Sequence, residues 1–219
     1  MKNGDFAEIE YIGKIKQSGD IFDLTDEKIA KEKGIFNSGT IYGPITIIVG
    51  AKQVLVGLDS AILSMNANDK KTINIEAKDA FGDRNPKLIK LIPLAQFKKQ
   101  NLDPKQGQYI TFDQGLRGKI LSVAGGRIKI DFNHPLAGKE LEYELKLNKI
   151  ITDNAKKVKS LISFYFGSAA KNIKTDVKET KVIIDIPKKT PINDVMKKKI
   201  EDDFKKYIPA IKTVEFKIA

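Results

Sequence analysis

Alternating apolar and polar residues predict β-strands in the first half of the chain. Residues 6–16 read FAEIEYIGKIK and place Ala7, Ile9 and Tyr11 on one face, which is the period of a half-buried strand. A turn at 17–19 leads into a second strand, DIFDLT, and ITIIVG and KKTINIEA follow as further strands. Residues 26–43 are polar and contain Gly and Asn, so we expect a long loop there.

One segment of this half has a helical period instead. In KQVLVGLDSAILSM the apolar residues recur at intervals of three and four positions, which predicts a short amphipathic helix. The residues that form this stripe are Val54, Leu58, Ala61, Ile62 and Met65.

The pattern changes after AFGDRN. Residues 86–130 contain four further strand signals, KLIKLIPLAQF, QYITFD, GKILSV and GRIKIDF. Turns are predicted at Asp113-Gln114-Gly115 and at Gly125-Gly126. This block therefore reads as a small β-rich module, and LEYELKLNKI then alternates as one more strand.

The last third of the chain reads as a separate α+β domain. The triplet Thr152-Asp153-Asn154 is typical of a helix cap, residues 155–166 and 191–207 have helical patterns, and KVIIDIP and TVEFKI read as strands. Residues 191–207 carry an apolar stripe made of Ile192, Val195, Met196, Ile200 and Phe204. The stripe needs a covering surface. Two strands give little cover, so the pattern favours self-association, and a homodimer through this domain is expected.

Composition excludes several classes of chemistry. The 219 residues contain no Cys and one His, which excludes disulfides, thiolate catalysis and a metal site rich in His or Cys. No apolar run has the length of a membrane span, and the N-terminus lacks the apolar core of a signal peptide. A cytoplasmic protein without membrane contact is the expectation.

The net charge of +11 is concentrated at one end, since residues 151–219 hold 16 Lys against nine Asp plus Glu. Lys is abundant and Arg scarce, whereas nucleic-acid readers favour Arg. We interpret the excess as solvated surface, and nucleic acid is disfavoured as a partner.

Four fragments follow one another in a distinctive order, IFDLT (21–25), VGAKQVLVGLDSAI (49–62), DAFGD (79–83) and NHPLAGKELEYEL (133–145). Together they resemble the FKBP family of peptidyl-prolyl isomerases, in particular its SlyD-like branch. The resemblance covers about 150 residues, and the tail resembles the extra domain of long archaeal members. It implies an α+β fold in which an antiparallel sheet wraps on a short helix, with an inserted β-rich domain and a C-terminal α+β domain. The implied domains are 1–85 with 131–152, 86–130, and 153–219.

The resemblance implies rotation about X–Pro bonds without a metal or another cofactor. That rotation faces a barrier of ~20 kcal/mol, which amide resonance maintains. An apolar pocket that binds the twisted, less polar amide more tightly than the planar one lowers this barrier.

The implied pocket combines residues from several fragments. Tyr11 and Phe22 line one wall, and Asp23 is the charged group near the substrate amide. Val54 and Leu55 lie at the helix start, where the Leu55 N–H holds a substrate carbonyl. The remaining residues are Leu58 at the floor, Phe81 and Tyr143 on the far side, and His134 and Leu136 at the rim.

Two of these positions depart from the best-known small members of the family. Leu58 stands where they have Trp, and Phe81 stands where they have Tyr. Without the resemblance, most pocket residues also fit an ordinary β-sheet core, and Asp23 fits a turn cap. Proton transfer does little for amide rotation, so His134 is expected to shape its loop rather than act as a base.

The insert is expected to bind unfolded client polypeptides. In KLIKLIPLAQF, six apolar residues crowd into a module too small to bury them all, so the expected binding patch comprises Leu88, Leu91, Ile92, Leu94 and Phe97, together with Ile89. The alternative is that they form the module's core. Two other functions stay open, a holdase chaperone with vestigial isomerase activity and a basic module associated with nucleic acid or the ribosome.

Overall fold

A computed structural model of the chain describes residues 1–99, 101–112 and 115–218. The chain divides into two compact units, Met1–Ile75 with Leu141–Ala219 and Glu76–Glu140. The predicted α+β class is confirmed, because each unit combines antiparallel strands with short helices. The domain bounds drawn from the sequence stay a prediction.

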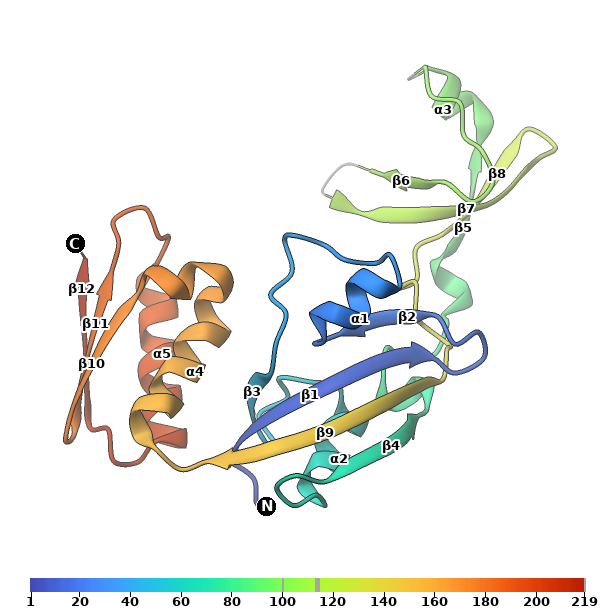
Figure 1. Ribbon diagram of the computed structural model, residues 1–219. Coiled ribbons are helices and arrows are strands. Elements are labelled where there is room, and N and C mark those ends of the chain that lie inside the picture. The colour runs from blue at the N-terminus through green and yellow to red at the C-terminus, as the bar shows by residue number, and fades with distance from the viewer. Residues whose placement is uncertain (100, 113–114, 219) are drawn as a thin grey trace. The chain divides into compact units, whose positions relative to one another are not determined.

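The first unit is built on a five-stranded antiparallel sheet, which we call the main sheet (Figure 1). Its central strands are β1 (Phe6–Ile15) and β9 (Leu141–Ile151), with β2 (Ile21–Leu24) and β4 (Lys70–Ile75) outside them. Strand β3 (Ile45–Ile48) pairs with the start of β1. All five strands coincide with the predicted strand patterns.

Two helices, α1 and α2, lie between the strands of the main sheet in the chain. Helix α2 (Val56–Leu63) lies where the helical period predicted it, and it packs on β4. Helix α1 (Glu27–Glu32) lies within residues 26–43, so the expectation of an unbroken loop there is wrong. Asp26 caps this helix by accepting from the Ile29 N–H at 3.0 Å, and Ala30 is buried. A short helix needs just such a cap and one apolar contact.

The second unit contains a four-stranded sheet in the order β5-β8-β7-β6, which we call the insert sheet. The elements of this second unit are η1 (Ala77–Asp79), η2 (Pro86–Leu88), β5 (Ile89–Pro93), α3 (Leu94–Lys99), β6 (Tyr109–Thr111), β7 (Arg117–Ala124) and β8 (Arg127–Asp131). The sequence predicted strands here, but the second half of KLIKLIPLAQF is helix α3. Pro93 has no N–H for a sheet ladder, and the strand ends there. The predicted turn residues Asp113 and Gln114 lie outside the described residues.

The tail forms an α+β layer within the first unit. Its elements are α4 (Asn154–Phe166), η4 (Gly167–Asn172), β10 (Lys174–Lys178), β11 (Lys181–Ile186), α5 (Asp194–Tyr207) and β12 (Thr213–Ile218). Asp153 caps α4 by accepting from the Lys156 N–H at 2.9 Å, as the sequence predicted. Strand β10 was not predicted. It pairs with β11 and makes the sheet three strands wide.

This wider tail sheet accounts for the apolar stripe of α5. Ile200 and Phe204 are fully buried in a cluster with residues of α4 and β11, and Ile192 and Met196 pack against that cluster. Val195 alone of the stripe is highly exposed, at 78%. The stripe is thus covered within its own chain, and the argument from it for self-association is wrong. The cluster also takes in Phe6, Ile48 and Ile151 of the main sheet.

Candidate active site

Three aromatic side chains meet on one face of the main sheet. Tyr11 on β1 and Tyr143 on β9 have ring centroids 5.6 Å apart, and Phe22 on β2 meets Tyr143 edge-on at 5.8 Å. Each ring comes from a different strand, so the backbone ladder fixes their spacing. We call these three rings the aromatic cluster. Offset and edge-on arrangements of this kind are the favourable ones for aromatic pairs.

Gly13 makes room for the aromatic cluster. It lies directly opposite Tyr143 on one side and Asp23 on the other. A Cβ atom at position 13 would lie 2.9 Å from Cζ of Phe22 and 3.0 Å from Cε1 of Tyr143, which is closer than carbon atoms pack. The sequence analysis missed this residue, although a glycine inside an alternating strand signals close approach of another group.

The charged member of the predicted site is held by the cluster. The Tyr11 hydroxyl donates to Oδ2 of the exposed Asp23 carboxylate at 2.9 Å. Burial, and then the nearby Asp23 charge, raise the pKa of both Tyr11 and Tyr143 well above the ordinary tyrosine value. Both phenols therefore stay protonated, and Tyr11 remains a hydrogen-bond donor across the physiological pH range.

Helix α2 closes the apolar side of this sheet. Leu58 is buried on α2, and Gly57 lets the helix approach so closely that a Cβ there would lie 2.6 Å from Cγ2 of Ile75. Val54 and Leu55 immediately precede the helix, and the Leu55 carbonyl accepts from the Asp59 N–H at 2.9 Å. Both residues thus lie at the helix start, as expected.

A buried carboxylate holds the segment that leads into α2. Asp59 accepts from the Gly50 N–H with both oxygens, at 2.9 and 3.1 Å. Gly50 has a φ of +78°, a conformation that favours glycine. Together they fix the loop that carries Val54 and Leu55. The sequence analysis did not single out Asp59, because a carboxylate in a helix pattern normally indicates a solvent-facing position.

Phe81, His134 and Leu136 belong to the second unit. The rings of Phe81 and His134 stack at 4.3 Å, nearly parallel. The Leu136 N–H donates to Nδ1 of His134 at 3.2 Å, so a neutral ring carries its proton on Nε2. The Gly138 N–H donates to the Gly82 carbonyl at 2.8 Å and joins the two loops. His134 thus shapes its loop, and the predicted role of these three residues at the pocket rim stays a prediction.

The predicted client-binding residues of the insert separate into two groups. Leu88 and Leu91 are exposed, at 42% and 61%. Phe97 is 4% exposed and packs with Ile120, Ile128 and Ile130, so it belongs to the insert's own core. Ile92 and Leu94 are partly buried against that core. Exposed apolar residues that the sequence analysis did not select are Leu102, Tyr109, Leu116 and Val123.

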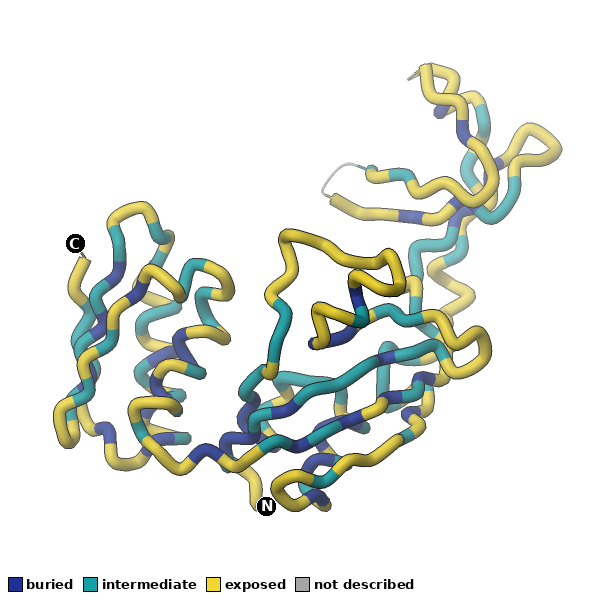
Figure 2. Tube along the Cα trace, in the orientation of Figure 1, coloured by how far each residue is buried: buried dark blue, intermediate teal, exposed yellow. Residues whose placement is uncertain are grey.

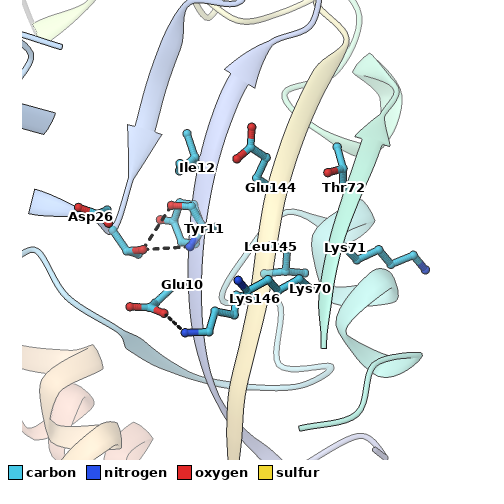
Figure 3. A pocket seen from close by; sticks show the side chains of 11 residues that line it. Glu10, Tyr11, Ile12, Asp26, Lys70, Lys71, Thr72, Glu144, Leu145 and Lys146 are labelled. Atoms are coloured by element: carbon cyan, nitrogen blue, oxygen red, sulfur yellow. Dashed lines mark hydrogen bonds and ion pairs between the residues drawn. The ribbon is translucent and has the colours of Figure 1, made fainter. Parts of the chain in front are cut away.

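The opposite face of the main sheet is polar. A hollow of about 550 Å³ lies there, and Figure 3 shows its charged lining, including the 3.0 Å ion pair between Lys146 and Glu10. In the described ranges, no group of three or more His, Asp or Glu side chains is placed to hold a metal ion. No helix within the described residues is long and apolar enough to cross a membrane.

The chain is similar to known proteins both in its insert and over most of its length. Residues 90–136 match the family model of the FKBP26 IF domain. A short-type peptidyl-prolyl cis-trans isomerase of Methanocaldococcus jannaschii is 33% identical over 150 residues, which is 68% of this chain and 94% of the relative. The chain belongs to the FKBP family of peptidyl-prolyl isomerases. Its insert sheet corresponds to the insert-in-flap domain, since the IF match covers β5 to β8.

Bacterial FKBP-type proteins are also similar to this chain. The SlyD protein of Helicobacter pylori is 28% identical over 143 residues, covering 64% of this chain and 70% of its own length. An FKBP-type 16 kDa peptidyl-prolyl cis-trans isomerase of Escherichia coli is 29% identical over 111 residues, covering 49% of this chain and 74% of its own length. The SlyD-like branch predicted from the sequence is thereby confirmed.

Proposed function

We propose that the chain catalyses cis-trans isomerisation of X–Pro bonds in unfolded or partly folded polypeptides. The aromatic cluster beside Asp23 carries this proposal. Its three rings, fixed by neighbouring strands, offer an apolar wall to a pyrrolidine ring, and a single carboxylate lies at its edge. No covalent step is needed for this reaction, which consists of a rotation.

The proposed mechanism is differential binding. A planar prolyl amide is resonance-stabilised and polar, whereas the amide twisted by about 90° has lost that resonance. Apolar walls that remove water from the amide disfavour the polar planar form more than the twisted one. The rings of Tyr11, Phe22 and Tyr143 grip the proline, and the buried Leu58 of α2 is the pocket floor. Rigid strands hold these groups, so little reorganisation accompanies the rotation.

The polar groups have distinct proposed roles. Asp23, oriented by the Tyr11 hydroxyl, interacts with the amide nitrogen side of the twisting bond. The Leu55 N–H at the helix start donates to a substrate carbonyl and anchors the chain. Phe81 has no hydroxyl, which removes one neutral hydrogen bond worth ~1 kcal/mol and leaves turnover moderately lower.

Replacing Asp23 tests the site directly. Asp23→Ala is expected to lower kcat/KM on a short X–Pro peptide by about tenfold or more, because a charge-assisted interaction contributes roughly 1.5–3 kcal/mol. The protease-coupled peptide assay and the refolding of a proline-limited protein provide the measurements. Asp20→Ala, an exposed carboxylate just before β2, is the matched control and should retain full activity. Full activity in Asp23→Ala would refute the assignment.

The insert supports a second part of the function, the capture of client chains. Its exposed Leu88 and Leu91, with Leu102 and Leu116, offer apolar side chains that its small core leaves uncovered. Capture raises the local concentration of prolyl bonds near the active site. A holdase with vestigial isomerase activity is the alternative. It predicts capture without a rate gain on short peptides, so the peptide assay decides between the two.

Hydrogen bonds join the two ends of the insert, so the insert can be deleted and its ends bridged by a short linker. Asn85 and Asn133 exchange two hydrogen bonds, from the Asn85 N–H at 2.8 Å and from the Asn133 side-chain amide at 3.0 Å. Arg84 pairs with Asp131 beside them. Burial raises the pKa of Asp131, but hydrogen bonds from Asn133 and Arg84 outweigh burial and hold it below the usual range. This tie is therefore retained at neutral pH.

Deleting residues 86–130 and bridging the ends with a short glycine linker is expected to leave a folded main sheet. Turnover of short peptides should persist, because the aromatic cluster lies wholly in the first unit. Catalysis of protein refolding should fall much further, because that substrate must first be captured. Equal losses on both substrates would contradict the division of labour between the main sheet and the insert.

The expected homodimer and the alternative of a basic module associated with nucleic acid or the ribosome have less support. The α5 stripe is covered within the chain, as described above. Several tail lysines are paired locally, among them Lys178 with Asp176, Lys181 with Glu215 and Lys197 with Asp194. Such pairing reduces the charge available to an anionic polymer. Sizing of the full chain at low and high salt, with and without RNA, tests both expectations.

A further inference from the structure

A large groove runs along β3 and the first helix of the tail. Its volume is about 970 Å³, at the top of the range of roughly 300–1,000 Å³ for ligand sites. Strand β3, the segment before it and Gln53 form one side, and residues of α4, η4 and β10 form the other. All of these belong to the first unit. We call this hollow the β3–α4 groove.

The charge of the β3–α4 groove has one sign. Lys159, Lys171 and Lys174 line it, and all three are exposed. No carboxylate occurs among the lining residues that the structure describes, although the chain holds 28 Asp plus Glu. The groove therefore favours a partner that carries negative charge.

Apolar side chains form much of the remaining lining. Ile162 and Ile173 are buried at its base, while Ile41 and Phe164 are each 51% exposed at its walls. An inorganic anion or a nucleic-acid backbone would leave this apolar surface unused. The combination fits a ligand with both apolar groups and carboxylates.

An open strand edge adds a third feature. Among the described residues β3 pairs with β1 and with no other strand. The Ile48 N–H points away from β1 and donates to Oε1 of Gln53 at 2.7 Å, so by strand alternation the backbone of Thr46 also faces away from β1. Thr46 lines the groove. An extended polypeptide can use such an edge by strand addition, which a lipid cannot.

The groove is also continuous with the proposed active site. Val54 lines it and directly precedes Leu55 at the start of α2. We propose that the β3–α4 groove is a second client-binding surface, which takes an extended segment with alternating apolar and acidic residues next to the prolyl bond. The link to catalysis rests on the proposed function, whereas binding in the groove does not.

A proline-free probe separates these two claims. We would measure fluorescence anisotropy of a fluorescein-labelled peptide that alternates valine and glutamate, titrated with the full chain. The triple variant Lys159→Glu, Lys171→Glu, Lys174→Glu should weaken binding by about tenfold or more, since it reverses the charge of the groove. The matched control Lys188→Glu, Lys189→Glu, Lys212→Glu makes the same charge change at exposed tail positions that do not line the groove, and it should lose less than about twofold.

A second variant tests the shape of the groove without changing charge. Ser163→Trp places a bulky ring in the lining and should weaken the same peptide by a similar factor, while circular dichroism confirms a native fold. A peptide that alternates valine and lysine should not bind. Equal losses in the groove and control triple variants, or no binding to the unaltered chain, would overturn the proposal. Self-association that disappears in the groove variant would assign the surface to a second copy instead and would equally overturn it.

The catalytic link has its own readout. With a substrate that joins the valine–glutamate segment to an X–Pro bond, the groove triple variant should raise KM several-fold and leave kcat unchanged. A short X–Pro peptide should show no change in either constant. If the chain lacks isomerase activity altogether, the anisotropy result still stands or fails on its own.

Discussion

In the main sheet, the strand face that carries Tyr11 and Tyr143 is covered by α2, and its far end joins the core of the tail. In the insert sheet, four strands have the six-residue α3 as cover, and the fully enclosed core consists of Phe97, Ile120, Ile128 and Ile130. Figure 2 shows the consequence, with buried positions running through the main sheet and exposed positions dominating the insert. The same kinds of residue thus build a closely packed aromatic cluster in one sheet and an uncovered surface in the other.

The difference lies in how tightly each sheet packs its apolar side chains. The proposed active site needs rings held in one geometry, and close packing and a glycine at position 13 hold the aromatic cluster in that way. A surface that captures varied clients needs apolar side chains that water already reaches, because covering them would abolish binding. The insert therefore has a small core and little covering structure. Its stability rests on few residues, and its function rests on others.

The largest effect is expected for Phe97→Ala. Removing this buried ring should cost about 3–5 kcal/mol and unfold the insert, while the main sheet stays folded. Chemical unfolding should then show the insert transition lost or shifted, and short-peptide turnover should persist. Phe164→Ala removes a ring that is half exposed and should cost about 1 kcal/mol or less. A global loss of structure in Phe97→Ala would show that the two sheets fold as one.

Gly13→Ala should damage catalysis rather than stability. The added Cβ must displace the rings of Phe22 and Tyr143, and displacements near 1 Å in an active site can cost about a hundredfold. We expect kcat/KM on a short peptide to fall by that order, with client capture by the insert unaffected. Gly39→Ala, where the added Cβ meets the side chain of Asn37, serves as control. Unchanged turnover in Gly13→Ala would remove the aromatic cluster from the mechanism.

Leu91→Ser should weaken client capture and leave stability and short-peptide turnover unchanged. This side chain is exposed, so its removal should change the free energy of unfolding by about 0.5 kcal/mol or less. Suppression of client aggregation should nevertheless weaken several-fold, measured by light scattering of a denatured protein. Lys90→Ser, at the neighbouring exposed position of β5, is the matched control. A large loss of stability in Leu91→Ser would place Leu91 in the core and contradict the comparison.

A smaller effect is expected at alkaline pH, and it is confined to the first unit. Burial raises the pKa of Tyr11, Tyr143 and Tyr165, and the hydrogen bond from the Tyr165 hydroxyl to Asp203 raises that of Tyr165 further. These phenols are therefore protonated in the folded state at a pH where they ionise in the unfolded state. Their contribution to stability is complete below about pH 10 and is lost as pH rises toward the folded values. Tyrosinate absorbance should therefore show Tyr11, Tyr143 and Tyr165 ionising above the ordinary tyrosine pKa. Ionisation of these three phenols at the ordinary value would contradict their burial and hydrogen bonding.

The sequence predicted the main sheet well because strand alternation and helix period each span enough residues to be read locally. It located Tyr11, Phe22, Asp23 and Tyr143, and the structure brings those four together. It missed Gly13 and Asp59, whose roles arise from neighbours distant in the chain. It also missed β10, and therefore concluded that α5 lacked cover. Phe97 was assigned to the client-binding surface because a run of apolar residues does not reveal that the strand ends at Pro93 and a helix begins at Leu94.

The pairing of β1 with β9 sets the order in which the chain can acquire its structure during synthesis. Phe6 pairs with Ile151, so the main sheet is incomplete until residue 151 has left the ribosome. The contacts of the insert lie within Glu76–Glu140 and need no later residue. Local contacts form faster than distant ones, and domains fold as their last residue emerges. The proposed client-binding surface is thus complete while the aromatic cluster still lacks Tyr143, so the part proposed to hold clients is assembled before the part proposed to act on their prolines.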